Sequence, residues 1–150
     1  MTTILPCTLG DVFDSPDAAA LLSEYARESA IDGLPAPTPC REIYAHIEQT
    51  GALHLFSAMH DGKLIGFLAL LVSVNPHYST PLAVTESYFV ASEYRYTGAG
   101  MGLLRAAEEH AAKLGAAGFL VSSPSAGRLS EILPRTGYRE TNRVFFKALA

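Results

Sequence analysis

The residues from Arg95 to Gly102 have the composition of a loop that could bind a phosphate group. They read Arg-Tyr-Thr-Gly-Ala-Gly-Met-Gly and lie between an apolar, strand-like run ending at Ala91 and a helical pattern beginning at Leu103. Glycines let the backbone approach a ligand closely, and the first N–H groups of a helix lack intrahelical partners and carry partial positive charge. The loop therefore suits a pyrophosphate, although the same glycines could simply permit a tight turn.

Two residues upstream could accept a proton. In the strand predicted from Ala83 to Ala91, alternation places Glu86 on one face with Val84, Tyr88 and Val90, and partial burial among them would raise the carboxyl pKa. Such a carboxylate suits a general base, and a solvated or arginine-paired glutamate is the alternative. The second candidate is His77, because imidazole titrates near neutrality, although it could be an ordinary loop histidine.

Other chemistry finds little support in the residue spacing. The histidines at 46, 54, 60 and 110 fall on different predicted elements without ligand spacing, so we expect no metal site. The serines near Ser123 lack the Gly-x-Ser-x-Gly motif of hydrolases. Cys7 and Cys40 are too few for a disulfide framework, which favours free thiols in the cytoplasm.

The composition limits the class of protein. The chain has 150 residues, of which 49% are hydrophobic and 17% charged, and this is typical of one compact domain spanning residues 1–150. Its 11 basic and 15 acidic side chains give a net charge of -4, so we expect no nucleic-acid partner. The apolar run from Leu64 to Val74 is too short to span a bilayer, and we expect no membrane contact.

Helix and strand signals alternate along the chain. The expected strands are 3–5, 53–60, 63–74, 83–91, 119–121, 138–142 and 144–149, and the expected helices are 15–30, 38–51, 98–114 and 125–136. Asp61-Gly62 is typical of a tight hairpin turn between the second and third of these strands. The pattern predicts an α/β (α+β) fold with a mixed, mostly antiparallel central sheet of six to seven strands flanked by about four helices.

The stretch YFVASEYRYTGAGMGLL, followed by FLVSS and LPRTGYRE, resembles the GNAT superfamily of acyl-CoA-dependent N-acetyltransferases. The family's cofactor loop has the pattern Arg or Gln, x, x, Gly, x, Gly or Ala, which Arg95, Gly98 and Gly100 fill. The resemblance implies a sheet splayed between its fourth and fifth strands, where main-chain groups near Phe89 and Val90 pair with the pantetheine arm. It also implies acetyl-CoA as cosubstrate, held at the residues Arg95, Tyr96, Thr97, Gly98, Ala99, Gly100, Met101 and Gly102.

For catalysis the resemblance implies Glu86 as base, directly or through water. The family's usual acid, a tyrosine four residues before the Gly-aromatic pair, is Leu133 here, so Tyr138, Tyr88, a serine near 122–125 or water takes that role, or no acid is needed. The activity implied is transfer of an acetyl group to a primary amine of a small molecule or peptide. A catalytically silent acyl-CoA sensor and a structural domain remain alternatives, and the apolar run Val144 to Phe146 suggests a homodimer.

Overall fold

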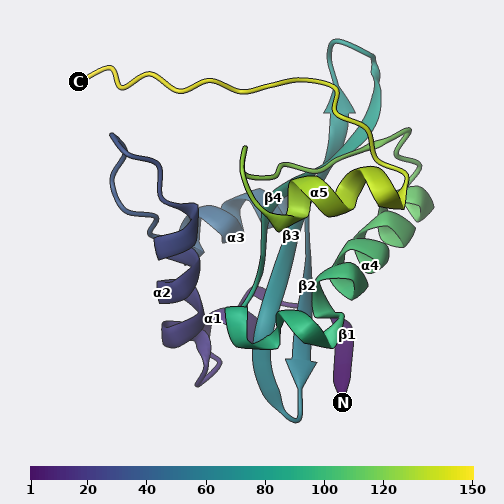
Figure 1. The fold of residues 1–150 in the computed structure, drawn as a ribbon. Coiled ribbons are helices and arrows are strands. Elements are labelled where there is room, and N and C mark those ends of the chain that lie inside the picture. Colours follow the sequence, from purple (N-terminus) through teal and green to yellow (C-terminus); the bar gives the residue numbers. More distant parts are fainter.

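A computed structural model describes residues 1–150 and shows a five-stranded sheet with helices on both faces (Figure 1). The strands are β1 (Thr2–Cys7), β2 (Leu53–His60), β3 (Lys63–Asn75), β4 (Thr80–Val90) and β5 (Phe119–Leu120). They lie in sequence order across the sheet, antiparallel from β1 to β4, and β5 is parallel to β4.

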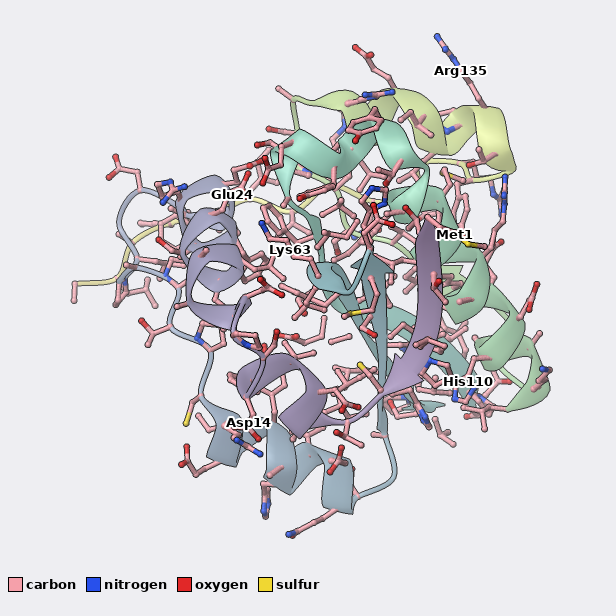
Figure 2. All side chains as sticks on the ribbon, turned by 90° about the horizontal axis from the view of Figure 1, so that it is seen from below. Met1, Asp14, Glu24, Lys63, His110 and Arg135 are labelled. Carbon is pink, nitrogen blue, oxygen red and sulfur yellow. The ribbon has the colours of Figure 1, made fainter.

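Helices cover both faces of the sheet. They are α1 (Leu9–Phe13), α2 (Ala18–Ser29), α3 (Arg41–Gln49), the 3-10 helix η1 (Ser92–Thr97), α4 (Ala99–Lys113), α5 (Arg128–Ile132) and the 3-10 helix η2 (Leu133–Thr136). Figure 2 shows α4, with His110, and α2, with Glu24, on opposite sides of the sheet. None of the helices has the length and apolar character needed to cross a membrane.

The core has one part on each face of the sheet. Against α4, the sheet residues Ile65, Leu68 and Leu70 pack on Leu103 and Ala107, and all five are at most 1% exposed. The opposite face carries two smaller clusters that involve α1, α2 and α3. The inner strands are therefore apolar on both sides, which keeps them rigid supports for the residues at their ends.

The β2–β3 hairpin confirms the turn expected from Asp61-Gly62. Both residues have positive φ, 48° for Asp61 and 80° for Gly62, and His60 pairs with Lys63 across the turn. Positive φ at both central residues is the conformation that matches the twist of two antiparallel strands.

The sheet opens between β4 and β5, as expected. The two strands pair only at Ala83 with Phe119 and at Val84 with Leu120, whereas β4 continues to Val90 beside β3. From Thr85 onward, one side of β4 has no neighbouring strand.

The expected sheet of six to seven strands is wrong, because the two terminal segments form no strand. Residues 138–142 and 144–149 lie in an extended tail that crosses toward the α2 side of the molecule (Figure 1). β-branched and aromatic residues favour a strand only where a neighbouring strand supplies a ladder, and β5 is too short to supply one. Phe146 contacts the α2–α3 loop instead, near Gly33.

The helices also differ in detail from the expectation of about four. α1 was not expected, yet Thr8 and Asp11 form a reciprocal capping box that starts it. The helix expected over 125–136 divides into α5 and η2, because Pro134 lies at the start of the second segment and lacks the N–H that would continue the first.

Candidate active site

The loop after β4 ends in a left-handed glycine that starts α4. Gly98 has a φ of 81°, the Ala99 amide donates to Thr97 Oγ1 at 3.2 Å, and the Gly102 amide donates to the Gly98 carbonyl at 3.0 Å. The amides of Gly100 and Met101 have no acceptor within the helix, because the first amides of any α-helix precede its first i to i−4 hydrogen bond. Apart from Thr97 no side chain accepts from the first turn of α4, and no acid lies in that turn, so the partial positive charge of the helix end is not neutralised.

The glycines of this loop serve different purposes. A Cβ on Gly98 would meet nothing within 4 Å, so the space above it is open. A Cβ on Gly102 would lie 2.8 Å from Ile4 Cγ1, so this glycine allows α4 to pack closely on β1. The Gly100 carbonyl accepts a hydrogen bond of 2.5 Å from the Tyr88 hydroxyl, which fixes the loop to β4.

Arg95 braces the loop rather than reaching away from it. Its Nε donates to the Val90 carbonyl at 2.9 Å, and its terminal nitrogen donates to both Glu28 carboxylate oxygens at 2.8 and 2.9 Å. The guanidinium also lies 5.3 Å from the centroid of the Phe89 ring. Arg95 therefore ties β4 to α2, while Tyr96 beside it is 79% exposed.

The open side of β4 presents main-chain groups of alternate residues. The Ala91 amide donates to Ile65 of β3 at 2.8 Å. Since hydrogen-bonding direction alternates along an antiparallel strand, the Phe89 amide also faces β3, and the amides of Tyr88 and Val90 face the opening.

A β-bulge decides where Glu86 lies. Ser87 pairs with Ala69 and Thr85 pairs with Leu70, so Glu86 is an extra residue in β4 with no partner on β3. The expectation that Val84, Glu86, Tyr88 and Val90 share one face is therefore wrong, because a bulge reverses the alternation beyond it.

The two sides of the bulge face different helices. Tyr88 and Val90 pair with Leu68 and Gly66 and belong to the side covered by α4. Glu86 instead extends to the opposite side, where the Tyr44 hydroxyl of α3 donates to both carboxylate oxygens at 2.9 Å.

The Glu86 side chain is exposed, so the expected partial burial is not found. Tyr44 is about half-buried, and this burial together with the adjacent Glu86 carboxylate raises the pKa of Tyr44. The Tyr44 hydroxyl therefore remains a hydrogen-bond donor throughout the neutral pH range. Burial, followed by the same carboxylate, also raises the pKa of Tyr25 on α2.

Glu86 lines an open hollow of about 320 Å³ between α2, α3, β4 and the loop that precedes α3. We call it the Glu86 hollow. Its other lining residues are Tyr25, Pro37, Thr38, Pro39, Cys40, Ile43, Tyr44 and Ile47. A smaller apolar cavity of about 40 Å³, which we call the inner cavity, shares Tyr25, Pro39 and Tyr44 with the hollow.

The structure does not bring the other two catalytic candidates to Glu86. His77 is exposed in the β3–β4 turn, and Thr80 to Glu86 alone spans roughly 20 Å of strand. Tyr138 lies beyond η2, edge-on to Phe119 of β5 with the ring centroids 6.3 Å apart. Its hydroxyl is buried without a hydrogen-bond partner, and burial together with nearby Glu108 raises the pKa of Tyr138.

Tyr44 is the site residue that the sequence did not reveal, because nothing in the helix pattern over 38–51 distinguishes it from a tyrosine that packs in the core. In the structure Tyr44 and Ile47 pack against the core, whereas Ile43 is exposed. A tyrosine carries a polar end that needs a partner, but the sequence does not show that Glu86 supplies it.

Residues 19–129 match the model of the acetyltransferase (GNAT) family. Among curated proteins, none matches this sequence at a significant level. The matched residues run from α2 to the start of α5 and include the loop before α4 and the Glu86 hollow.

Solved structures show the same fold at low identity. An aminoglycoside acetyltransferase from an uncultured soil metagenomic sample, in complex with sisomicin, has a TM-score of 0.74 at 17% identity, covering 99% of this chain and 97% of that one. A ribosomal-protein-alanine N-acetyltransferase from Brucella melitensis biovar Abortus 2308 has a TM-score of 0.71 at 20% identity, and the match covers 98% of each chain. A transcriptional regulator from Bacillus halodurans C-125 has a TM-score of 0.76 at 17% identity, and the match covers 98% of this chain and 99% of that one.

Three independent features thus agree: a strand that leaves its parallel neighbour, a helix N-terminus open to an anion, and a family model that spans both. The chain belongs to the GNAT acetyltransferase family.

Proposed function

We propose that the protein transfers an acetyl group from acetyl-CoA to a primary amine. The observation that carries this proposal is the position of Glu86, at the mouth of a hollow and on the strand whose open side leads to the N-terminus of α4. A proton acceptor, a binding space for an amine and an anion site thereby lie along one strand.

The residues before α4 fit the coenzyme. The first-turn amides of Gly100 and Met101 would hold its pyrophosphate above the open space at Gly98, with Tyr96 and Thr97 at the edge. The main chain near Phe89 and Val90 would bind its pantetheine arm, and the outward-facing amide of Val90 is the donor best placed for it. When bound, the coenzyme supplies an acetyl group activated as a thioester.

Glu86 is the general base of this proposal, and His77, which lies before the start of β4 in the β3–β4 turn, takes no part in it. The amine nitrogen attacks the thioester carbonyl carbon, a C–N bond forms, and the C–S bond breaks with its electron pair moving to sulfur. One proton leaves the nitrogen for Glu86, directly or through water, and the departing sulfur takes one proton from water. Tyr44 would hold the carboxylate toward the amine through its hydrogen bonds.

Tyr138 would assist the departing sulfur by donating a hydrogen bond from its buried hydroxyl. A thiol has a pKa near 8.5 and the pKa of Tyr138 is raised above the ordinary phenol value, so complete proton transfer to the thiolate would be uphill. Removing this hydroxyl should therefore cost less than removing Glu86.

Substitution of Glu86 tests the chemistry. Glu86→Gln should lower kcat by about 10²- to 10⁴-fold, because the amide cannot accept the proton. Glu48→Gln on α3 is the matched control, since Glu48 is exposed and does not line the hollow. Acetyl-CoA binding without turnover of any amine, unchanged in Glu86→Gln, would instead support the sensor.

A matched pair of glycines tests the coenzyme site. Gly98 and Gly115 share a φ of 81°, and a Cβ on either would meet nothing within 4 Å. Alanine at either position should cost roughly 1–2 kcal/mol of folding stability. Only Gly98→Ala should also weaken coenzyme A binding, by about tenfold or more in calorimetry, because its methyl group would enter the phosphate space. No coenzyme binding to the wild type would favour a structural domain.

We also propose that two copies of the chain associate through their tails. Val144, Phe145 and Leu149 are between 88% and 94% exposed, and β5 has no neighbour on its outer side. The apolar tail of one copy could therefore pair as a strand with the free edge of β5 in the other copy.

A further inference from the structure

The lining of the Glu86 hollow points to one class of amine. Resting on the function proposed above, we propose that the acceptor is a primary amine with a single positive charge and an apolar body, such as an alkylamine or an arylalkylamine. The argument combines the charge of the hollow, its apolar walls and the inner cavity.

The hollow carries one charge. Glu86 is the only ionisable acid or base in its lining besides the thiol of Cys40 and the phenols of Tyr25 and Tyr44. No Lys, Arg or His pairs with Glu86. One ammonium group can therefore meet one carboxylate, whereas further ammonium groups would find no second carboxylate in the lining.

The walls of the hollow are apolar. Two prolines come from the loop before α3, and Ile43 and Ile47 of α3 lie four residues apart on the side facing the hollow. Ile43 is 62% exposed, which leaves its surface free to contact a ligand. Glu42, which accepts from the Cys40 thiol at 3.2 Å, lies outside the lining.

The inner cavity adds to the apolar surface. Besides the residues shared with the hollow, its lining is Leu9, Val12, Phe13, Leu22, Leu55, Phe67, Ala69 and Ser87. Its volume suits the end of an alkyl chain or the edge of a ring, and Ser87 is its only side chain with an aliphatic hydroxyl. Because Tyr44 borders both spaces and also binds Glu86, an amine at the carboxylate would direct its body toward this cavity.

This lining would select against the acceptor class of one similar structure. That acetyltransferase was solved with sisomicin, an aminoglycoside with several amino and hydroxyl groups. Amino and hydroxyl groups held against Pro37, Pro39, Ile43 and Ile47 would gain no hydrogen bond from those side chains.

Steady-state kinetics with amines of graded size test the inference. For n-alkylamines from ethyl to hexyl, kcat/KM should rise about tenfold or more in total, because added methylene groups become buried. The kcat/KM for 2-phenylethylamine should exceed the values for spermidine, sisomicin and a peptide with an N-terminal alanine by a similar factor. Equal or better turnover of any of these three competitors, or a flat alkyl series, would overturn the inference.

Calorimetry separates this inference from the proposed function. If no amine is acetylated, the transferase proposal fails, yet 2-phenylethylamine should still bind more tightly than spermidine in the presence of coenzyme A. Failure of 2-phenylethylamine to bind would refute the inference by itself. Acetylation of spermidine alone would refute the inference and leave the transferase proposal standing.

A charge placed in the hollow provides the matched variant. Ile43→Glu adds a second carboxylate at an exposed position, where folding should tolerate it, and should shift the ratio of kcat/KM toward spermidine by about tenfold. Gln49→Glu makes a comparable change at an exposed position of α3 outside the lining and should leave the ratio unchanged. An unchanged ratio in a folded Ile43→Glu protein would contradict the inference.

Discussion

Glu86 reaches its hollow because β4 contains one extra residue opposite β3 at that point. Without the bulge, alternation would group Glu86 with Tyr88 and Val90 on the side covered by α4. The bulge instead turns the carboxylate toward α3, while the residues beyond it continue the pairing with β3 up to Val90, shortly before the loop that starts α4. The bulge thus lets β4 present Glu86 on the α3 side of the sheet and Tyr88 and Val90 on the α4 side.

Removal of the Tyr44 hydroxyl tests how the carboxylate is held. Tyr44→Phe should lower kcat by about tenfold, since a hydrogen bond to a charged group contributes roughly 1.5–3 kcal/mol and Glu86 is exposed to water. KM for acetyl-CoA should not change. Tyr78→Phe, at an exposed tyrosine in the β3–β4 turn, is the control and should behave like the wild type. An equal kcat in both variants would exclude Tyr44 as a positioning residue.

The path from β4 to α4 is fixed by contacts between elements. Arg95 joins the end of β4 to Glu28 of α2, and the Ser92 amide donates to Glu24 on the same helix at 2.9 Å. On the other side, Gly102 brings α4 against β1. The N-terminus of α4 is therefore held from both faces of the sheet, and the coenzyme site proposed there would be preformed.

The contact between α4 and β1 predicts a coupled pair of substitutions. Gly102→Ala should lower the free energy of unfolding by about 1–3 kcal/mol, because its methyl group would lie 2.8 Å from Ile4 Cγ1. In the Ile4→Ala background the same change should cost less, since the clashing atom is absent. Urea denaturation of the four proteins measures this coupling, and strictly additive losses would show that the contact does not govern the packing.

The sequence predicted those elements whose cause is local. Asp61-Gly62 defines its hairpin through the φ values of the two residues, and the glycines before α4 mark a loop for the same reason. The bulge at Glu86 was not predictable in this way, because it depends on the register between β3 and β4. The hydrogen bond from Tyr44 depends on that bulge and was missed with it.

At the scale of the whole molecule, the C-terminal tail is the part whose structure the sequence predicted wrongly. Val144 to Phe146 has the composition of a strand, yet it extends away from the sheet with Phe146 near Gly33. Strand formation requires a partner, and the partner is a property of the assembled sheet rather than of the segment. The exposed tail is therefore the feature on which the proposed association depends.

Removal of the tail tests that association. Light scattering of the full chain should give about twice the mass of 16.0 kDa, and deletion of residues 143–150 should give the monomer mass. Val144→Lys with Phe145→Lys should act like the deletion, because the charged side chains disfavour edge pairing. A full-length protein that stays monomeric across working concentrations would remove the proposal.

The separation of β4 from β5 affects the handling of the purified protein. Beyond Thr85 the main chain has an interior edge that no strand occupies, and such edges recruit strands from neighbouring molecules. We therefore expect the ligand-free form to aggregate more readily on concentration or storage, and we expect a small molecule that fills the gap to act as a stabilising additive.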